Sequence, residues 1–105
     1  MIQQLRIYQL YAATAEAFHT RFRDHAVRIF ARHGIVIRQA WTTEHDGVPE
    51  FAYLIEWPDQ ATMQAAWTAF SADEEWQQIK RDTAAVHGPM LAAISDRTLE
   101  SVEFR

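Results

Sequence analysis

Two histidines in one helical pattern are the first candidates for binding or catalysis in this 105-residue chain. His25 and His33 fall on the apolar side of the segment FHTRFRDHAVRIFARHGI when successive residues are placed about 100° apart. An imidazole at position 25 could bind a ligand or transfer a proton, or it could be a core histidine with satisfied hydrogen bonds. For His33, which precedes Gly34, an interaction with the helix dipole is the simpler role.

Arg6 is the cation that we expect to reach a cavity, because it has apolar neighbours in the strand-like segment QLRIYQLY. Its guanidinium could hold a carboxylate or an enolate there. A salt bridge to a strand carboxylate, such as Glu56 or Glu100, is the simpler alternative.

Aromatic residues could supply the walls of such a cavity. The chain has four tryptophans, at positions 41, 57, 67 and 76, and aromatic residues at core-facing spacing usually pack in the core. Together with Tyr8 and Tyr53 they could instead line an apolar cavity that holds a planar ligand. The predicted ligand site, in which no catalytic residue is assigned, consists of Arg6, Tyr8, His25, Trp41 and Trp67.

The composition argues against several other kinds of site. The absence of cysteine removes disulfides, thiolate nucleophiles and cysteine-ligated metals, and no two histidines have the i, i+4 spacing of a helical zinc site. No glycine-rich phosphate loop, catalytic triad or pair of catalytic carboxylates can be recognised. We therefore expect neither a metal nor a cofactor.

The overall charge and hydropathy limit the partners. A net charge of −4 disfavours nucleic acids and anionic membranes. No apolar stretch approaches the roughly 18 residues that span a bilayer, and the N-terminus lacks a signal-peptide pattern. We expect a cytoplasmic protein with a single domain over residues 1–105, because a chain of this length that is 49% hydrophobic supplies one core.

The secondary-structure signals give the order β-α-β-β-α-(α)-β. Strands are predicted at Gln4–Tyr11, Ile35–Thr43, Phe51–Trp57 and Ile94–Val102, with a turn at Asp46-Gly47 between the middle two. The first helix is predicted from a Thr14 cap to His33, with Arg21, Asp24 and Arg28 pointing away from the core. A second helix is predicted after an Asp59 cap, with Met63, Trp67 and Phe70 inside, and a short third helix from Asp73.

This order is the split βαβ plan of ferredoxin-like α+β domains, in which helices cover one face of a four-stranded antiparallel sheet. Both faces of the strands are apolar. One row, formed by Phe51, Tyr53, Ile55 and Trp57, would be an exposed patch if it faced away from the helices. We therefore expect a homodimer in which two protomers stack their sheets, and we expect Asp at position 53 or 55 to break or unfold it.

Several segments resemble the NIPSNAP-like proteins of the dimeric α/β-barrel group. They are LRIYQL, FHTRFRDHAVRIFARHGI, WTTE, FAYLIEW, DQATMQAAWTAF, ADEEW and the GP before the last strand. The resemblance covers residues 5–102 and implies a ferredoxin-like protomer, a homodimer whose sheets form a barrel, and no family-wide catalytic residue. The wider barrel group includes cofactor-independent monooxygenases, haem-degrading enzymes and isomerase-like proteins.

Two classes of function follow from these observations. The first is a barrel that binds a small apolar or aromatic molecule in a protomer pocket, with the chemistry of a cofactor-independent oxygenase or an isomerase. The second is a non-catalytic dimeric module for structure or interaction. A cavity lined by polar groups would favour the first class.

Overall fold

The computed structural model describes residues 1–104, so Arg105, the last residue of the predicted domain, lies outside the described part. The strands are β1 (Ile2–Leu10), β2 (Ile37–His45), β3 (Val48–Trp57) and β4 (Leu91–Glu100). The helices are α1 (Ala15–Arg21), α2 (Val27–Arg32), α3 (Gln60–Ser71) and α4 (Glu74–His87), with a 3₁₀ turn at Ala12–Thr14 and a π-helical turn at Phe22–Ala26.

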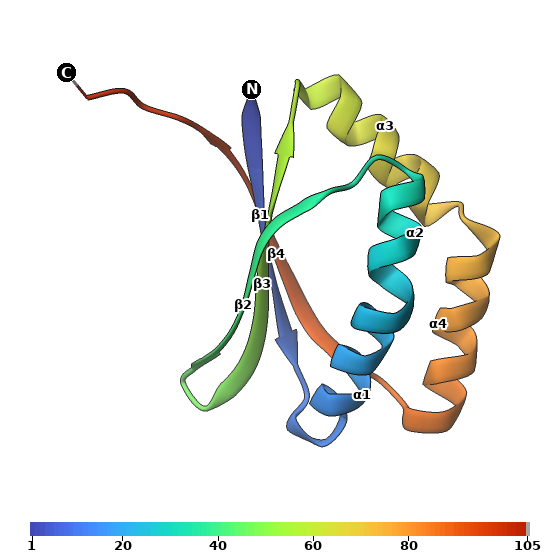
Figure 1. The fold of residues 1–105 in the computed structure, drawn as a ribbon. Coiled ribbons are helices and arrows are strands. Elements are labelled where there is room, and N and C mark those ends of the chain that lie inside the picture. The colour runs from blue at the N-terminus through green and yellow to red at the C-terminus, as the bar shows by residue number, and fades with distance from the viewer. Residues whose placement is uncertain (105) are drawn as a thin grey trace.

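The four strands form one antiparallel sheet in the order β2-β3-β1-β4. All the helices lie on the same side of this sheet (Figure 1). This arrangement confirms the predicted ferredoxin-like α+β fold. None of the helices within residues 1–104 is both long and apolar enough to cross a membrane.

The turn between β2 and β3 is tighter than predicted. Asp46 and Gly47 have φ angles of 51° and 79°, which is the left-handed backbone that a two-residue hairpin loop requires. Because the loop needs only these two residues, His45 pairs directly with Val48 and the strands reach further toward the turn than the sequence indicated.

Side chains define the starts of two helices as predicted. Asp59 accepts a hydrogen bond from the Thr62 amide at 2.7 Å at the start of α3, and Asp73 accepts one from the Trp76 amide at 3.0 Å at the start of α4. Thr14 precedes α1, but its hydroxyl donates to the Pro89 carbonyl at 2.9 Å and does not cap the helix.

The first helical segment contains a feature that the sequence did not reveal. Between α1 and α2 the chain makes a wider π-helical turn, in which each residue advances by less than the 100° of an α-helix. His25 lies in this turn and is only partly buried, whereas Ala26 and Ile29 are buried. The predicted position of His25 in the middle of the apolar side was therefore wrong, while the burial of Ala26 and Ile29 agrees with the helical pattern.

The row Phe51, Tyr53, Ile55 and Trp57 faces the helices and is buried in the core, so the exposed patch considered for it does not exist. Because strand residues alternate between faces, the open face carries the other parity. Leu5 pairs with Leu54 there, and Ile7 pairs with Ala52. Trp41, opposite Ala52, extends this apolar row onto β2 and is 45% exposed.

The last two elements also differ in length from the prediction. The third helix was predicted to be short, but α4 has 14 residues and ends before Gly88. The strand predicted at 94–102 runs from Leu91 to Glu100. In the observed register, β4 pairs with β1 and Asp96 lies opposite Arg6.

Candidate functional site

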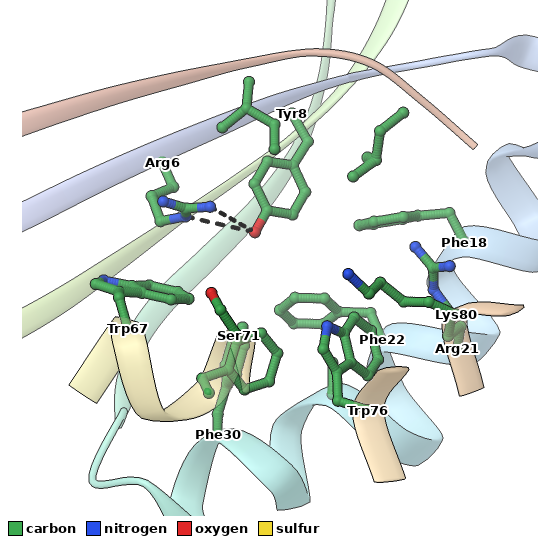
Figure 2. Close-up of a pocket in the computed structure, with 14 residues that line it drawn as sticks. Arg6, Tyr8, Phe18, Arg21, Phe22, Phe30, Trp67, Ser71, Trp76 and Lys80 are labelled. Atoms are coloured by element: carbon green, nitrogen blue, oxygen red, sulfur yellow. Dashed lines mark hydrogen bonds between the residues drawn. The ribbon is translucent and has the colours of Figure 1, made fainter. Parts of the chain in front are cut away.

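A cavity of about 260 Å³ lies inside the protomer, between the helices and the half of the sheet formed by β1 and β4. Figure 2 shows its lining residues converging from both layers. Most of its walls are aromatic or aliphatic. The lining residues are Arg6, Tyr8, Phe18, Arg21, Phe22, Ala26, Phe30, Trp67, Phe70, Ser71, Trp76, Lys80, Leu91 and Ile94.

At one end, β1 presents Arg6 and Tyr8 on its helix-facing side. The Arg6 Nε donates to the Tyr53 hydroxyl at 2.9 Å, and the Arg6 Nη2 donates to the Tyr8 hydroxyl at 3.3 Å. The two tyrosine hydroxyls also share a hydrogen bond. The Arg6 guanidinium lies 4.2 Å from the centre of the Trp67 ring, in cation–π contact.

This arrangement determines which of the two tyrosine hydroxyls donates in the hydrogen bond between them. Tyr53 is fully buried, and its two hydrogen-bond partners are Arg6, which can only donate, and Tyr8. The Tyr53 proton must therefore go to the Tyr8 oxygen, since a buried hydroxyl without an acceptor is costly. Tyr8 accepts from both neighbours and keeps its own proton for an acceptor in the cavity.

Tyr53 and Arg6 hold their ordinary protonation states firmly. Burial raises the pKa of Tyr53 far above its usual value, helped by the nearby Tyr8, so Tyr53 is a neutral phenol. Burial of Arg6 opposes its charge, but Tyr8, Tyr53 and Asp96 together outweigh burial and raise the pKa of Arg6. Arg6 is a permanent cation here.

Gln4 and Asp96 fix Arg6 from the sheet side. Gln4, 2% exposed, accepts hydrogen bonds from the indole N–H groups of Trp57 at 2.9 Å and Trp67 at 2.8 Å. Its amide nitrogen donates to both carboxylate oxygens of Asp96, at 3.0 and 2.9 Å. Asp96 in turn pairs with the Arg6 Nη1 at 2.6 Å. The charge of Arg6 is thus balanced by Asp96, and not by Glu56 or Glu100.

The opposite end of the cavity carries two further cations, Arg21 and Lys80 (Figure 2). Arg21 donates to the Thr83 hydroxyl at 3.1 Å and lies 5.2 Å from the centre of a Trp76 ring. Burial lowers the pKa of Arg21. Within residues 1–104, neither Arg21 nor Lys80 forms an ion pair with a carboxylate.

The structure brings together three of the five predicted site residues, Arg6, Tyr8 and Trp67, around one cavity. His25 does not join them: it lies in a shallow surface depression and its Nδ1 is 3.0 Å from the Arg28 Nη2. Trp41 lies on the open face of the sheet. The predicted convergence of all five residues is therefore not found: His25 and Trp41 do not line this cavity.

The residues that the sequence reasoning missed are those that the helices contribute. Arg21 was predicted to point away from the core, yet it is half-buried and lines the cavity. Phe18 and Phe22, from the same helical segment, line the cavity and were not among the predicted site residues. A signal for Arg21 existed in its spacing of three residues from Phe18, which puts it beside the apolar side of the helix.

His33 and Asp73 interact at the junction of α2 and α4, away from the cavity. The His33 Nε2 lies 2.7 Å from an Asp73 carboxylate oxygen. A hydrogen bond with His33 and the Trp76 amide lower the pKa of Asp73. Among residues 1–104, no group of three or more His, Asp or Glu side chains is placed to hold a metal ion.

The chain is similar to a known protein family and to several solved structures. A model of the NIPSNAP family matches residues 3–104. The chain is 19% identical to a solved, uncharacterized NIPSNAP domain protein from Burkholderia xenovorans, with a TM-score of 0.82 and coverage of 100% of this chain and 98% of that one. A NIPSNAP family protein from Agrobacterium tumefaciens is 14% identical, with a TM-score of 0.82 and coverage of 98% and 94%.

A more distant solved structure, an antibiotic biosynthesis monooxygenase, is 13% identical, with a TM-score of 0.62 and coverage of 98% of this chain and 100% of that one. At such identities the likeness concerns the fold alone. A search of curated proteins finds no match.

Proposed function

The chain belongs to the NIPSNAP family, and we propose that it binds a small aromatic or apolar organic molecule in the cavity of each protomer. One observation carries the proposal: a largely aromatic cavity of about 260 Å³ that Tyr8 and Arg6 line at one end. Apolar walls with a few fixed polar groups are typical of small-molecule sites. The Tyr8 hydroxyl would donate to a carbonyl or enolate oxygen of the ligand.

The catalytic form of this proposal is enolisation: the carbon next to the ligand carbonyl loses a proton to a base from solvent, and the negative charge moves to the oxygen that faces Tyr8. A phenol donor beside a permanent guanidinium charge favours an enolate over its ketone, because both groups stabilise developing negative charge on oxygen. An isomerase or a cofactor-independent oxygenase needs this step. The fold shared with a monooxygenase is consistent with it but does not supply the residues.

Binding can be tested by protein-observed NMR with a set of neutral one- and two-ring aromatic amides that includes 1-naphthylacetamide. The indole N–H signals of Trp67 and Trp76, which line the cavity, should shift, while that of Trp41 should not. Failure of every amide to move the Trp67 and Trp76 signals would leave the alternative, a non-catalytic module.

A variant that fills the cavity tests whether the shifts come from binding there, and a variant outside the cavity is its control. Ser71 lines the cavity from α3 and is exposed, so Ser71→Leu should occupy the space without disturbing the core. Ala69→Leu adds a side chain to an exposed position of the same helix outside the cavity. We expect the first variant to abolish the shifts and the second to keep them.

We also propose a homodimer that buries the open face of the sheet. In the described part of the chain, the helices all lie on the other side of the sheet from the apolar row of Leu5, Ile7, Ala52 and Leu54 (Figure 1). Such a face is typical of an interface between copies of a chain. Residence in the cytoplasm stays a prediction.

A further inference from the structure

The cations at the two ends of the cavity differ in how their charges are balanced. Arg6 makes an ion pair with Asp96 and donates to Tyr8 and Tyr53, so its charge and most of its donors are already used. Arg21 has only neutral partners among residues 1–104, the Thr83 hydroxyl and the Trp76 ring. Lys80 lines the same cavity from α4.

Among residues 1–104, no carboxylate lines the cavity, although the chain as a whole has a net charge of −4. A half-buried guanidinium without a counterion is unfavourable, because burial removes water that would stabilise the charge. An acidic group on the ligand would supply the missing charge. It would accept hydrogen bonds from both Arg21 and Lys80, which line the cavity on the side away from Arg6 (Figure 2).

We propose that the ligand is an aromatic or arylalkyl acid whose anionic group binds Arg21 and Lys80, while its other end faces Tyr8 and Arg6. This inference rests on the proposed function, since it needs the cavity to be a binding site. It assigns the anchoring of the ligand to Arg21 and Lys80, and leaves the Tyr8 end free for recognition of a neutral oxygen or for the enolisation.

The test compares 1-naphthylacetate with 1-naphthylacetamide, which have nearly the same shape and differ in charge, by NMR titration of the Trp76 indole signal. Charge-assisted hydrogen bonds should make the acid bind roughly 10- to 100-fold more tightly than the amide at low salt. Added salt should reduce this preference, because the site opens to solvent at the Lys80 end.

Variants locate the anchoring group. Arg21→Gln and Lys80→Gln should each reduce the ratio of acid affinity to amide affinity. Arg81→Gln removes the same charge from the next residue of α4, which lies outside this cavity and donates to Gln78, and it should keep the preference.

Equal affinity for the two probes, or a preference that survives both Arg21→Gln and Lys80→Gln, would overturn the anionic assignment while leaving a neutral binding site in place. Absence of binding by both probes and by the wider amide set would overturn the proposed function itself. Loss of acid preference in Arg81→Gln would also overturn the assignment, because it would trace the preference to general surface charge.

Discussion

Replacing Gln4 by leucine should destabilise the protein more than any exposed polar substitution. The side-chain carbonyl of Gln4 is the acceptor for two indole N–H groups, those of Trp57 and Trp67. Leucine has a similar size but no acceptor. The substitution therefore leaves the core shape nearly unchanged and removes two hydrogen bonds together.

The magnitude follows from the burial of the two indoles. Trp57 is 1% exposed, so its N–H loses its partner without access to water, whereas Trp67 is half-buried and can regain a water molecule. An orphaned buried donor costs about 1–3 kcal/mol. Asp96 loses its hydrogen bonds from the Gln4 amide, but its carboxylate is exposed enough for water to replace them. Its ion pair with Arg6 remains. We expect a total loss of about 2–4 kcal/mol in the free energy of unfolding.

Urea denaturation at fixed protein concentration measures this loss, with Gln64→Leu as the control, because Gln64 is exposed on α3. The control should change the free energy of unfolding by no more than about 0.5 kcal/mol. In a Trp57→Phe background, where the indole donor is absent, Gln4→Leu should cost about 1 kcal/mol less. A loss below about 0.5 kcal/mol for Gln4→Leu, or full additivity in the double variant, would refute the assigned hydrogen bonds.

Three further outcomes follow from the structure. Hydrogen bonds from Arg28 and Arg32 lower the pKa of Glu75 from 4.5 to about 2, so the stabilisation is complete above pH 4.5 and is lost as the pH falls toward 2; Glu75→Gln should flatten the acid dependence of stability in that range, while Glu74→Gln should not. Leu54→Asp on the open face should give a folded monomer by light scattering, whereas Ile55→Asp on the helix-facing side should unfold the chain; a folded dimer of Leu54→Asp would refute the proposed interface. His25→Leu should alter the free energy of unfolding by less than about 0.5 kcal/mol and leave 1-naphthylacetamide binding unchanged, because His25 lies outside the cavity.

The features that the sequence predicted correctly depend on local chemistry. The Asp46-Gly47 turn, the Asp59 and Asp73 caps and the stop at Gly34 each need only a few adjacent residues with specific backbone or side-chain preferences. The element order, and with it the ferredoxin-like fold, follows from these boundaries.

The features that were missed depend on contacts distant in sequence. Both parities of β3 are apolar, so periodicity alone did not show that Tyr53 and Ile55 face the helices. Asp96 was not connected with Arg6, because their pairing requires the register of β4 on β1. Gln4 did give a signal: it is a polar residue on the same face of an apolar strand as Arg6 and Tyr8, which predicts a buried polar network.

The position of α4 explains why a cavity exists over β1 and β4. At its start, Asp73 and Glu75 form ion pairs with Arg32, and Glu75 also pairs with Arg28. These contacts hold α4 beside the first helical segment and away from the sheet (Figure 1). Ile94, on the helix-facing side of β4 opposite Tyr8, therefore remains 49% exposed.

The space left above Ile94 is continuous with the cavity that Tyr8, Trp76 and Lys80 line. Full coverage of β4 by a helix would bury more apolar surface and close this space. With the ion pairs of Glu75 in place, α4 lies beside the first helical segment and does not cover β4. The same contacts place Lys80, one and a half turns further along α4, at the cavity end where we infer that an anionic ligand binds.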